Sequence, residues 1–236
     1  VPAVPVPALL PGKEEPIVPI PAPPPPKPPA GLPVRLLPFA PPPPPAPPIA
    51  TPVAPEQGPG ISSVQSGDAF TSCADVTQIP QLECEALVAL YNSTNGPNWA
   101  NHPGWLESNT PCNWGGVNCE SGTNVTRLHL EMYNLQGTIP AEIGNFTKLK
   151  YLAIIHNPGL TGSIPSEIGN LAELTNLYLN NNQLTGAIPS TLSNLSSLTY
   201  LILNNNHLTG SIPAGIGNLR QLEYFSLALN QISGNI

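Results

Sequence analysis

One phrase recurs through the second half of the chain with a nearly fixed period. It reads approximately L-x-x-L-x-L-x-x-N-x-L-x-G-x-I-P, and its copies span Leu149–Gly162, Leu174–Gly186, Leu198–Gly210 and Leu222–Gly234, with a weaker first copy at Val125–Gly137. Successive copies start 24, 25, 24 and 24 positions apart. A constant period of this length is typical of a solenoid, in which each repeat buries its apolar side chains against its neighbours. Residues 125–236 are therefore expected to form a stacked array of about 4.5 repeats.

Alternating leucines within each copy predict one short strand per repeat. In Leu177-Tyr178-Leu179 the leucines should point inward and the tyrosine outward, because successive side chains of a strand face opposite sides. The consensus asparagine also points inward, where hydrogen bonds to the backbone would make a buried polar group acceptable. These strands should form a parallel sheet on the concave face of a right-handed α/β repeat solenoid. The inward asparagines are Asn157, Asn182, Asn206 and Asn230, and the first copy has Tyr133 in their place.

The outward positions of successive strands should form columns on the concave face. Four of the six tyrosines of the chain fall in these columns, on a face that we expect to be solvated. Large amphipathic rings on such a face favour contact with protein or carbohydrate. Filling of strand positions by residues with high β-propensity explains them equally well. The candidate ligand-binding residues are Arg127, His129, Tyr151, Asn176, Tyr178, Asn180, Tyr200, Ile202, Asn204 and Tyr224.

All four cysteines lie just before the repeats, at Cys73, Cys84, Cys112 and Cys119. An even number clustered at one end of a repeat array indicates disulfides, and hence an oxidising compartment. A zinc site with these four ligands is the alternative, although neither sequential pair has the short C-x₂₋₄-C spacing of structural zinc sites. The preferred pairing is Cys73 with Cys84 and Cys112 with Cys119.

A small N-terminal cap is expected over residues 73–124. Cys84, Leu87, Val88 and Tyr91 follow Pro80 at helical spacing and give one apolar stripe. All three tryptophans of the chain, Trp99, Trp105 and Trp114, come within the next stretch. We expect them to form a small core that covers the open end of the first repeat.

The segment Cys112-Asn113-Trp114-Gly115-Gly116-Val117-Asn118-Cys119 resembles the C-x-W-x-G-V-x-C element in the N-terminal cap of plant-type extracellular leucine-rich-repeat proteins. Glu85–Tyr91 resembles the A-L-x-x-L helix of the same cap, and L-T-G-x-I-P recurs at Leu160–Pro165, Leu184–Pro189 and Leu208–Pro213. The resemblance covers roughly residues 73–236. It implies roles such as those of receptor-like kinase ectodomains or polygalacturonase-inhibitor-like proteins.

The remaining residues form a proline-rich N-terminal arm. Residues 1–60 hold 25 of the 34 prolines and only one aromatic residue, Phe39, so they cannot form a packed core. We expect a disordered, largely polyproline II arm that acts as a spacer, followed by a flexible linker at residues 61–72. At ~3.1 Å per residue its stiff reach would be on the order of 180 Å.

Charge and motif content narrow the possible functions. The net charge of −7 excludes the basic footprint that nucleic acid or an anionic membrane requires. His129, Arg127 and Glu131 share one strand face, but no nucleophile, metal-ligand set or phosphate loop accompanies them, so neither catalysis nor a cofactor is expected. In a secretory eukaryote, glycans could occupy the sequons at Asn92, Asn124, Asn145 and Asn194.

The leading hypothesis is an extracellular or cell-surface recognition module that binds a protein, a peptide or a glycan on its concave face. A coreceptor or a second copy could contact its lateral surface. The alternatives are a structural or adhesive scaffold of a surface or cell wall, and the ectodomain fragment of a receptor kinase. The array ends at Ile236 within an unfinished G-x-I-P phrase, so we expect the chain to be part of a longer protein.

Overall fold

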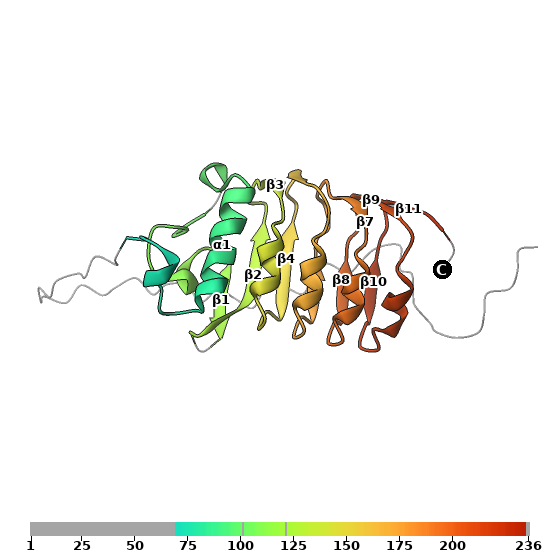
Figure 1. The fold of residues 1–236 in the computed structure, drawn as a ribbon. Helices are drawn as coiled ribbons and strands as arrows, with labels where there is room; N and C mark the ends of the chain where they lie inside the picture. The colour runs from blue at the N-terminus through green and yellow to red at the C-terminus, as the bar shows by residue number, and fades with distance from the viewer. Residues whose placement is uncertain (1–68, 101, 121, 235–236) are drawn as a thin grey trace, which may run out of the picture. The chain divides into compact units, whose positions relative to one another are not determined.

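The computed structural model describes residues 69–100, 102–120 and 122–234 and shows a repeat solenoid with a helical cap (Figure 1). The predicted arm at 1–60 and most of the predicted linker at 61–72 lie outside these residues. Figure 1 shows the labelled strands side by side along the array, with α1 at the end where the cap lies. The predicted solenoid and its N-terminal cap are confirmed.

The repeats share a six-stranded sheet with the order β1-β2-β4-β6-β8-β10. Only β1 and β2 pair in the antiparallel sense, and every later pair is parallel. The predicted parallel sheet, with one strand from each repeat, is therefore confirmed. The strands are β1 (Val117–Glu120), β2 (Asn124–Glu131), β4 (Tyr151–Ile155), β6 (Asn176–Tyr178), β8 (Tyr200–Ile202) and β10 (Tyr224–Ser226).

The second half of each repeat forms a short strand and then a 3₁₀ turn. The strands pair between repeats in two smaller sheets, β3-β5 and β7-β9-β11, which the sequence analysis did not predict. Each 3₁₀ turn begins directly after the proline of the G-x-I-P element, because proline lacks the N–H that the start of a helix leaves unpaired. The strands are β3 (Gln136–Thr138), β5 (Gly159–Thr161), β7 (Thr185–Ala187), β9 (His207–Gly210) and β11 (Gln231–Ile232); the turns are η4 (Ala141–Asn145), η5 (Ser166–Asn170), η6 (Ser190–Asn194) and η7 (Ala214–Asn218).

The inward asparagines join neighbouring repeats through their side-chain amides. Asn206 is buried, and its Nδ2 donates to the carbonyls of Leu179 (2.9 Å) and Leu203 (3.0 Å). Its Oδ1 accepts a hydrogen bond of 3.0 Å from the backbone N–H of Leu184. Asn182 and Asn230 make equivalent sets of bonds. The predicted role of these asparagines in satisfying backbone groups at the end of each strand is confirmed.

Two disulfides hold the cap together. They join Cys73 to Cys84 and Cys112 to Cys119, with Cα–Cα distances of 5.5 Å and 5.4 Å. The preferred pairing is confirmed, and the alternative of a four-cysteine zinc site is wrong because every sulfur is bonded to another. The cap elements are η1 (Cys73–Asp75), α1 (Gln81–Ser93), η2 (Gly96–Asn98) and η3 (Pro111–Asn113). Phe70, which the sequence analysis places in the linker, packs edge-on against Trp114 at 5.6 Å between ring centroids.

The tryptophans close the first repeat as predicted. Trp99, Trp105 and Trp114 are buried, and the ring of Trp99 lies 5.7 Å from that of Tyr133 in the first repeat. Tyr133 thus replaces the consensus asparagine where the array meets an aromatic core rather than another repeat. Burial of these rings supplies much of the apolar area that a small cap can remove from water.

A buried carboxylate also joins the cap to the first repeat. Glu83 on α1 accepts hydrogen bonds from the backbone N–H of Val125 (2.7 Å) and from Nδ2 of Asn124 (2.9 Å). Burial raises the pKa of Glu83, while these two hydrogen bonds act in the opposite direction.

Among the residues described, no helix has the length and apolar character needed to span a bilayer.

The hydrogen bonds of the inward asparagines predict that alanine at Asn206 lowers the free energy of unfolding much more than alanine at Asn204. Asn206→Ala leaves the buried N–H of Leu184 without a partner and removes one of the two side-chain bonds that the carbonyls of Leu179 and Leu203 each accept. The free energy of unfolding should fall by about 3 kcal/mol, from ~1–3 kcal/mol for the unpaired N–H and ~1 kcal/mol for each lost hydrogen bond. In Asn204→Ala the cost should stay below ~1 kcal/mol, because Asn204 Oδ1 has no hydrogen-bond partner among the described residues. Urea unfolding of both variants measures the difference. Equal losses would show that the inward amide does not join the repeats.

Candidate functional site

The register of the six-stranded sheet brings the candidate ligand-binding residues into adjacent columns. Arg127 lies opposite Tyr151, Tyr151 opposite Asn176, Asn176 opposite Tyr200, and Tyr200 opposite Tyr224. In the second column Tyr178 lies between Ala153 and Ile202, and His129 lies opposite Ala153 on the other side. Asn180 and Asn204 lie two positions after the last residues of β6 and β8. We call this outward surface of the sheet the ladder face.

Four tyrosines form a continuous series of ring contacts across four strands. Ring centroids lie 5.5 Å apart between Tyr151 and Tyr178, and 6.2 Å apart between Tyr178 and Tyr200. Tyr200 and Tyr224 stack at 4.7 Å with an interplanar angle of 10°. We call these four residues the tyrosine ladder. Contacts at these distances arise because adjacent strands lie only ~4.8 Å apart and each of β4 to β10 contributes one ring.

The sequence predicted a solvated face, but the centre of the ladder face is buried. Tyr178 and Ile202 are 2% and 4% exposed, and Tyr151 and Asn180 are buried as well. The reason is that these side chains pack on one another and on Ala153 and Ile155 as a second apolar cluster, separate from the leucine core. The other candidates are half-buried: Arg127, His129, Asn176, Tyr200, Asn204 and Tyr224.

The N-terminal end of the ladder carries its positive charge. The guanidinium carbon of Arg127 lies 3.6 Å from the centroid of the Tyr151 ring, a cation–π contact. Burial raises the pKa of the Tyr151 phenol, and the nearby charge of Arg127 opposes that rise. Burial and Arg127 both lower the pKa of His129, against the opposing effect of Glu131. His129 is therefore mainly neutral at pH 7, since its ordinary pKa is already about 6.5.

A row of polar side chains borders the tyrosine ladder, and the candidate list from sequence omitted it. Glu131 lies 3.3 Å from both His129 Nε2 and His156 Nδ1. His156 Nε2 is 2.9 Å from Asn181 Nδ2, and Asn205 Nδ2 donates to Asn181 Oδ1 at 2.7 Å. The backbone at Asn181 and Asn205 has φ values of 59° and 57°, a conformation that asparagine tolerates better than most residues. Asparagine at the same place in successive copies was the signal that could have revealed this row.

The titratable side chains of the ladder face lie on an open surface. Within residues 69–234, as far as they are described, no group of three or more His, Cys, Asp or Glu side chains could hold a metal ion. His129 and Glu131 sit in contact on an open strand face, with side-chain exposures of 25% and 38%. Chemistry of the general acid–base type would need a reacting group held away from water, which this surface does not provide.

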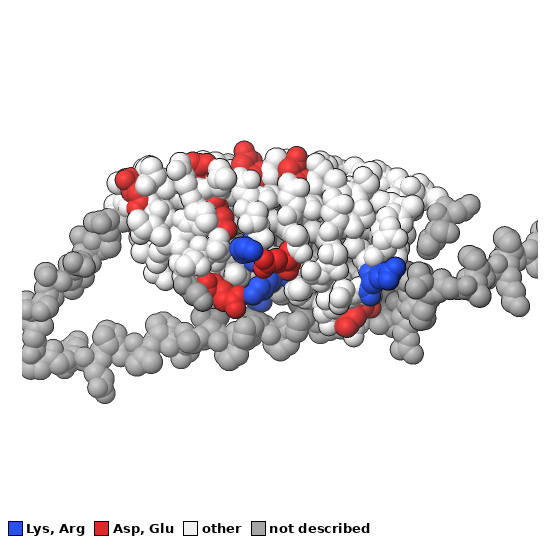
Figure 2. All heavy atoms as spheres, turned by 60° about the horizontal axis from the view of Figure 1, so that its bottom comes forward, with Lys and Arg blue, Asp and Glu red and all other residues white. Residues whose placement is uncertain are grey.

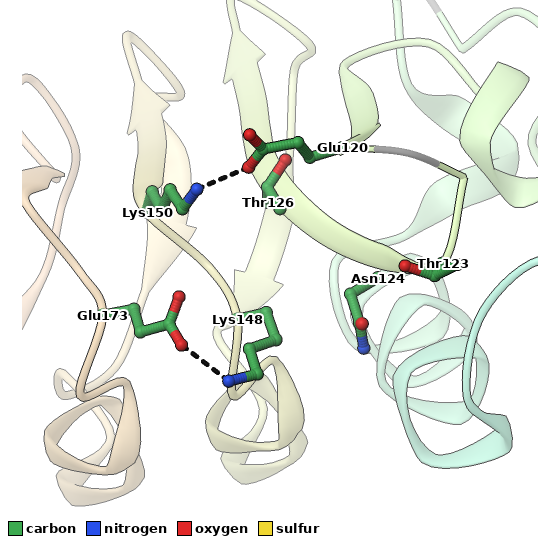
Figure 3. A pocket seen from close by; sticks show the side chains of 7 residues that line it. All are labelled: Glu120, Thr123, Asn124, Thr126, Lys148, Lys150 and Glu173. Carbon is green, nitrogen blue, oxygen red and sulfur yellow. Dashed lines mark hydrogen bonds and ion pairs between the residues drawn. The ribbon is translucent and has the colours of Figure 1, made fainter.

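A separate polar hollow of about 230 Å³ lies beside β1 and β2 (Figure 3). Lys150 is paired with Glu120, and Lys148 with Glu173 at 2.7 Å, so the charges in the hollow are matched. On the face shown in Figure 2, basic side chains lie next to acidic ones in the lower half, several acidic side chains stand alone along the upper edge, and most of the surface is uncharged. This hollow presents no excess of one charge with which to select a ligand. It is lined by Glu120, Thr123, Asn124, Thr126, Lys148, Lys150 and Glu173.

The four sequons differ in how available their asparagines are. Asn92 and Asn194 are exposed, at the ends of α1 and η6. Asn145 is half-buried at the end of η4. The amide nitrogen of Asn124 already donates to buried Glu83, so a glycan there would have to be attached beside a buried carboxylate. Occupancy of these sites stays a prediction, and the structure favours Asn92 and Asn194.

Known proteins match the cap and the repeats together. The family described as a leucine-rich repeat region matches residues 123–234, and the leucine rich repeat N-terminal domain matches residues 80–120. A chain in the crystal structure of the BIR3–SERK2 complex from Arabidopsis thaliana is 36% identical, with a TM-score of 0.55 over 63% of this chain and 82% of that one. The chain belongs to the leucine-rich-repeat proteins with a plant-type cap.

Two further relatives of this leucine-rich-repeat protein are much longer. The ectodomain of the Arabidopsis thaliana receptor kinase GASSHO1/SCHENGEN3 is 34% identical with a TM-score of 0.61, over 65% of this chain and 19% of that one. A probable inactive receptor kinase of Arabidopsis thaliana is 39% identical over 80 residues, which are 33% of this chain and 12% of the relative. This leucine-rich-repeat protein therefore spans only a small part of the length of these two relatives.

The contact between Arg127 and Tyr151 predicts a shift in an alkaline titration. Arg127→Met removes the positive charge that favours the phenolate, so the pKa of Tyr151 should rise further above its ordinary value of about 10. NMR of ¹³C-labelled tyrosine rings follows this titration residue by residue. Arg220→Met, which removes a charge elsewhere, should leave Tyr151 unchanged. A lower pKa of Tyr151 in the Arg127 variant would contradict the geometry.

Proposed function

We propose that this leucine-rich-repeat protein is an extracellular recognition module whose ladder face binds a protein or peptide ligand. The observation that carries the proposal is the tyrosine ladder, a row of amphipathic rings in contact across four repeats. Tyrosine and arginine are enriched among the residues that dominate binding energy at protein interfaces. Arg127 at the N-terminal end of the tyrosine ladder and the asparagine amides in the polar row beside it add hydrogen-bond donors that would fix the orientation of a ligand.

The relatives support this kind of partner. Two of the related structures are complexes: BIR3 with SERK2, and the GASSHO1/SCHENGEN3 ectodomain with CASPARIAN STRIP INTEGRITY FACTOR 2. We propose that this chain likewise acts as a ligand-binding ectodomain, by recognition and not by catalysis. The two disulfides of the cap support an oxidising, extracellular location. A glycan ligand remains the alternative on the same face, since aromatic rings also contact sugars.

The test compares one pair of substitutions on the ladder face with one pair on the separate sheet that contains β7 and β9. The full chain is screened against immobilised synthetic peptides and oligosaccharides, and the tightest probe is titrated against each variant. Tyr200→Ala with Tyr224→Ala should weaken binding by ~30-fold or more, since two interface tyrosines at ~1 kcal/mol each amount to ~2 kcal/mol. Thr185→Ala with Thr209→Ala, at exposed positions of β7 and β9, should change the affinity by less than ~2-fold.

Circular dichroism and thermal unfolding establish that both double variants keep the fold. Unchanged probe binding by a folded Tyr200/Tyr224 variant would overturn the proposal that the ladder face is the binding surface. It would favour the alternative of a structural or adhesive scaffold, whose repeats stack and adhere without a ligand on this face.

A further inference from the structure

The tyrosine ladder has a spacing and a chemistry that match one segment of this same chain. Alternate strands of a sheet are ~9.6 Å apart, twice the ~4.8 Å between neighbours. A polyproline II helix repeats every three residues, or ~9.3 Å at ~3.1 Å per residue. A polyproline II segment lying across the strands would therefore present the same edge to every second strand. Tyr151 on β4 and Tyr200 on β8 are two strands apart in one column.

Residues 41–48 provide such a segment, with seven prolines in eight positions. Extended as polyproline II, eight residues span ~25 Å, whereas the three strand spacings from β4 to β10 amount to only ~14 Å. The segment is therefore long enough to cross all four strands, where the half-buried rings of Tyr200 and Tyr224 offer more contact surface than the buried rings of Tyr151 and Tyr178. Aromatic-lined surfaces are the usual docking sites for polyproline II, because proline rings pack on aromatic faces and the segment loses little entropy on binding.

The hydrogen-bonding groups are complementary as well. A proline has a carbonyl acceptor and no N–H, and a polyproline II helix uses none of its carbonyls internally. The ladder face supplies donors in the tyrosine hydroxyls and in Arg127. The carbonyls of the proline segment can accept from the donors that remain accessible to solvent, among them the hydroxyls of the half-buried Tyr200 and Tyr224.

The connection between the two parts favours an intramolecular contact. The described chain begins at the cap, where Phe70 packs on Trp114, just before the edge strand β1 of the same sheet. From Pro48 to Ala69 is 21 residues, and a flexible chain of that length has a root-mean-square span of ~25 Å. Such a tether gives an effective concentration of the order of 1 mM, so a contact with a Kd of ~1 mM would be half-formed.

We propose that the proline-rich segment 41–48 docks in cis on the tyrosine ladder and competes with ligands for it. This extends the proposed function, because it concerns the same ladder face, and it assigns the arm a regulatory role in addition to that of a spacer. Ligand binding would then require displacement of the segment. Weakening the segment should accordingly raise the apparent affinity of any ligand that uses the tyrosine ladder, by removing its competitor.

The experiment places a spin label on the segment and observes the tyrosine rings of the full chain. Ala46→Cys introduces a cysteine that can be labelled selectively, because the four native cysteines form disulfides. With ¹³C-labelled tyrosine, the oxidised nitroxide should broaden the ring signals of the tyrosine ladder more than those of Tyr91 and Tyr133 in and beside the cap. Serine in place of the seven prolines at 41–48 should remove this difference.

Two results would overturn the proposal. One is equal broadening of ladder and cap tyrosines, or broadening that the serine variant retains. The other comes from a mixture in which one chain carries the spin label and a second chain carries the ¹³C-labelled tyrosines. Selective broadening that occurs only in this mixture would show that the segment binds another copy. No external ligand is present in this experiment, so its failure leaves the proposed recognition by the ladder face intact. Conversely, if no probe binds the ladder face, the spin-label experiment still tests whether residues 41–48 dock there.

Discussion

Each inward asparagine uses both ends of its amide to bond backbone groups of its own and the preceding repeat. Asn206 makes four such bonds, and Asn230 makes four in the next turn of the solenoid. A buried amide tolerates no shift in register, since any slip would leave several buried polar groups unpaired at ~1–3 kcal/mol each. The leucine core, by contrast, is apolar throughout and would accept other alignments. The asparagines therefore determine which residues lie opposite each other.

This register is what produces a functional surface from short strands. Three-residue strands such as β6, β8 and β10 are too short to be stable as independent units, yet their outward side chains are aligned across four repeats. Because of this alignment, Tyr200 stacks on Tyr224 at one end of the tyrosine ladder, and Tyr151 contacts the guanidinium of Arg127 at the other end. The same alignment forms the polar row from Glu131 to Asn205. Recognition and stability thus depend on the same hydrogen bonds.

The parts of this structure that follow from local pattern were predictable from the sequence. The periods of leucine and asparagine indicated the sheet and the column of each outward residue, and helical spacing indicated the helix now seen at Gln81–Ser93. Other features depend on contacts between residues far apart in the chain. Glu83 meets Val125 across 42 positions, and the pairing of β7 with β9 joins segments of only three and four residues, which are too short to show an apolar alternation. The burial of Tyr178 arises from its neighbours on adjacent strands, so its own repeat contains no signal for it.

The central claim is that the tyrosine rings form one contiguous surface in solution. Nuclear Overhauser effects between the rings of the full chain test it most directly, with successive tyrosines labelled in turn to assign the signals. The structure predicts cross-peaks for Tyr151 with Tyr178, Tyr178 with Tyr200 and Tyr200 with Tyr224, the last being strongest at a centroid separation of 4.7 Å. Tyrosine rings that show cross-peaks only to residues of their own repeat would contradict the account.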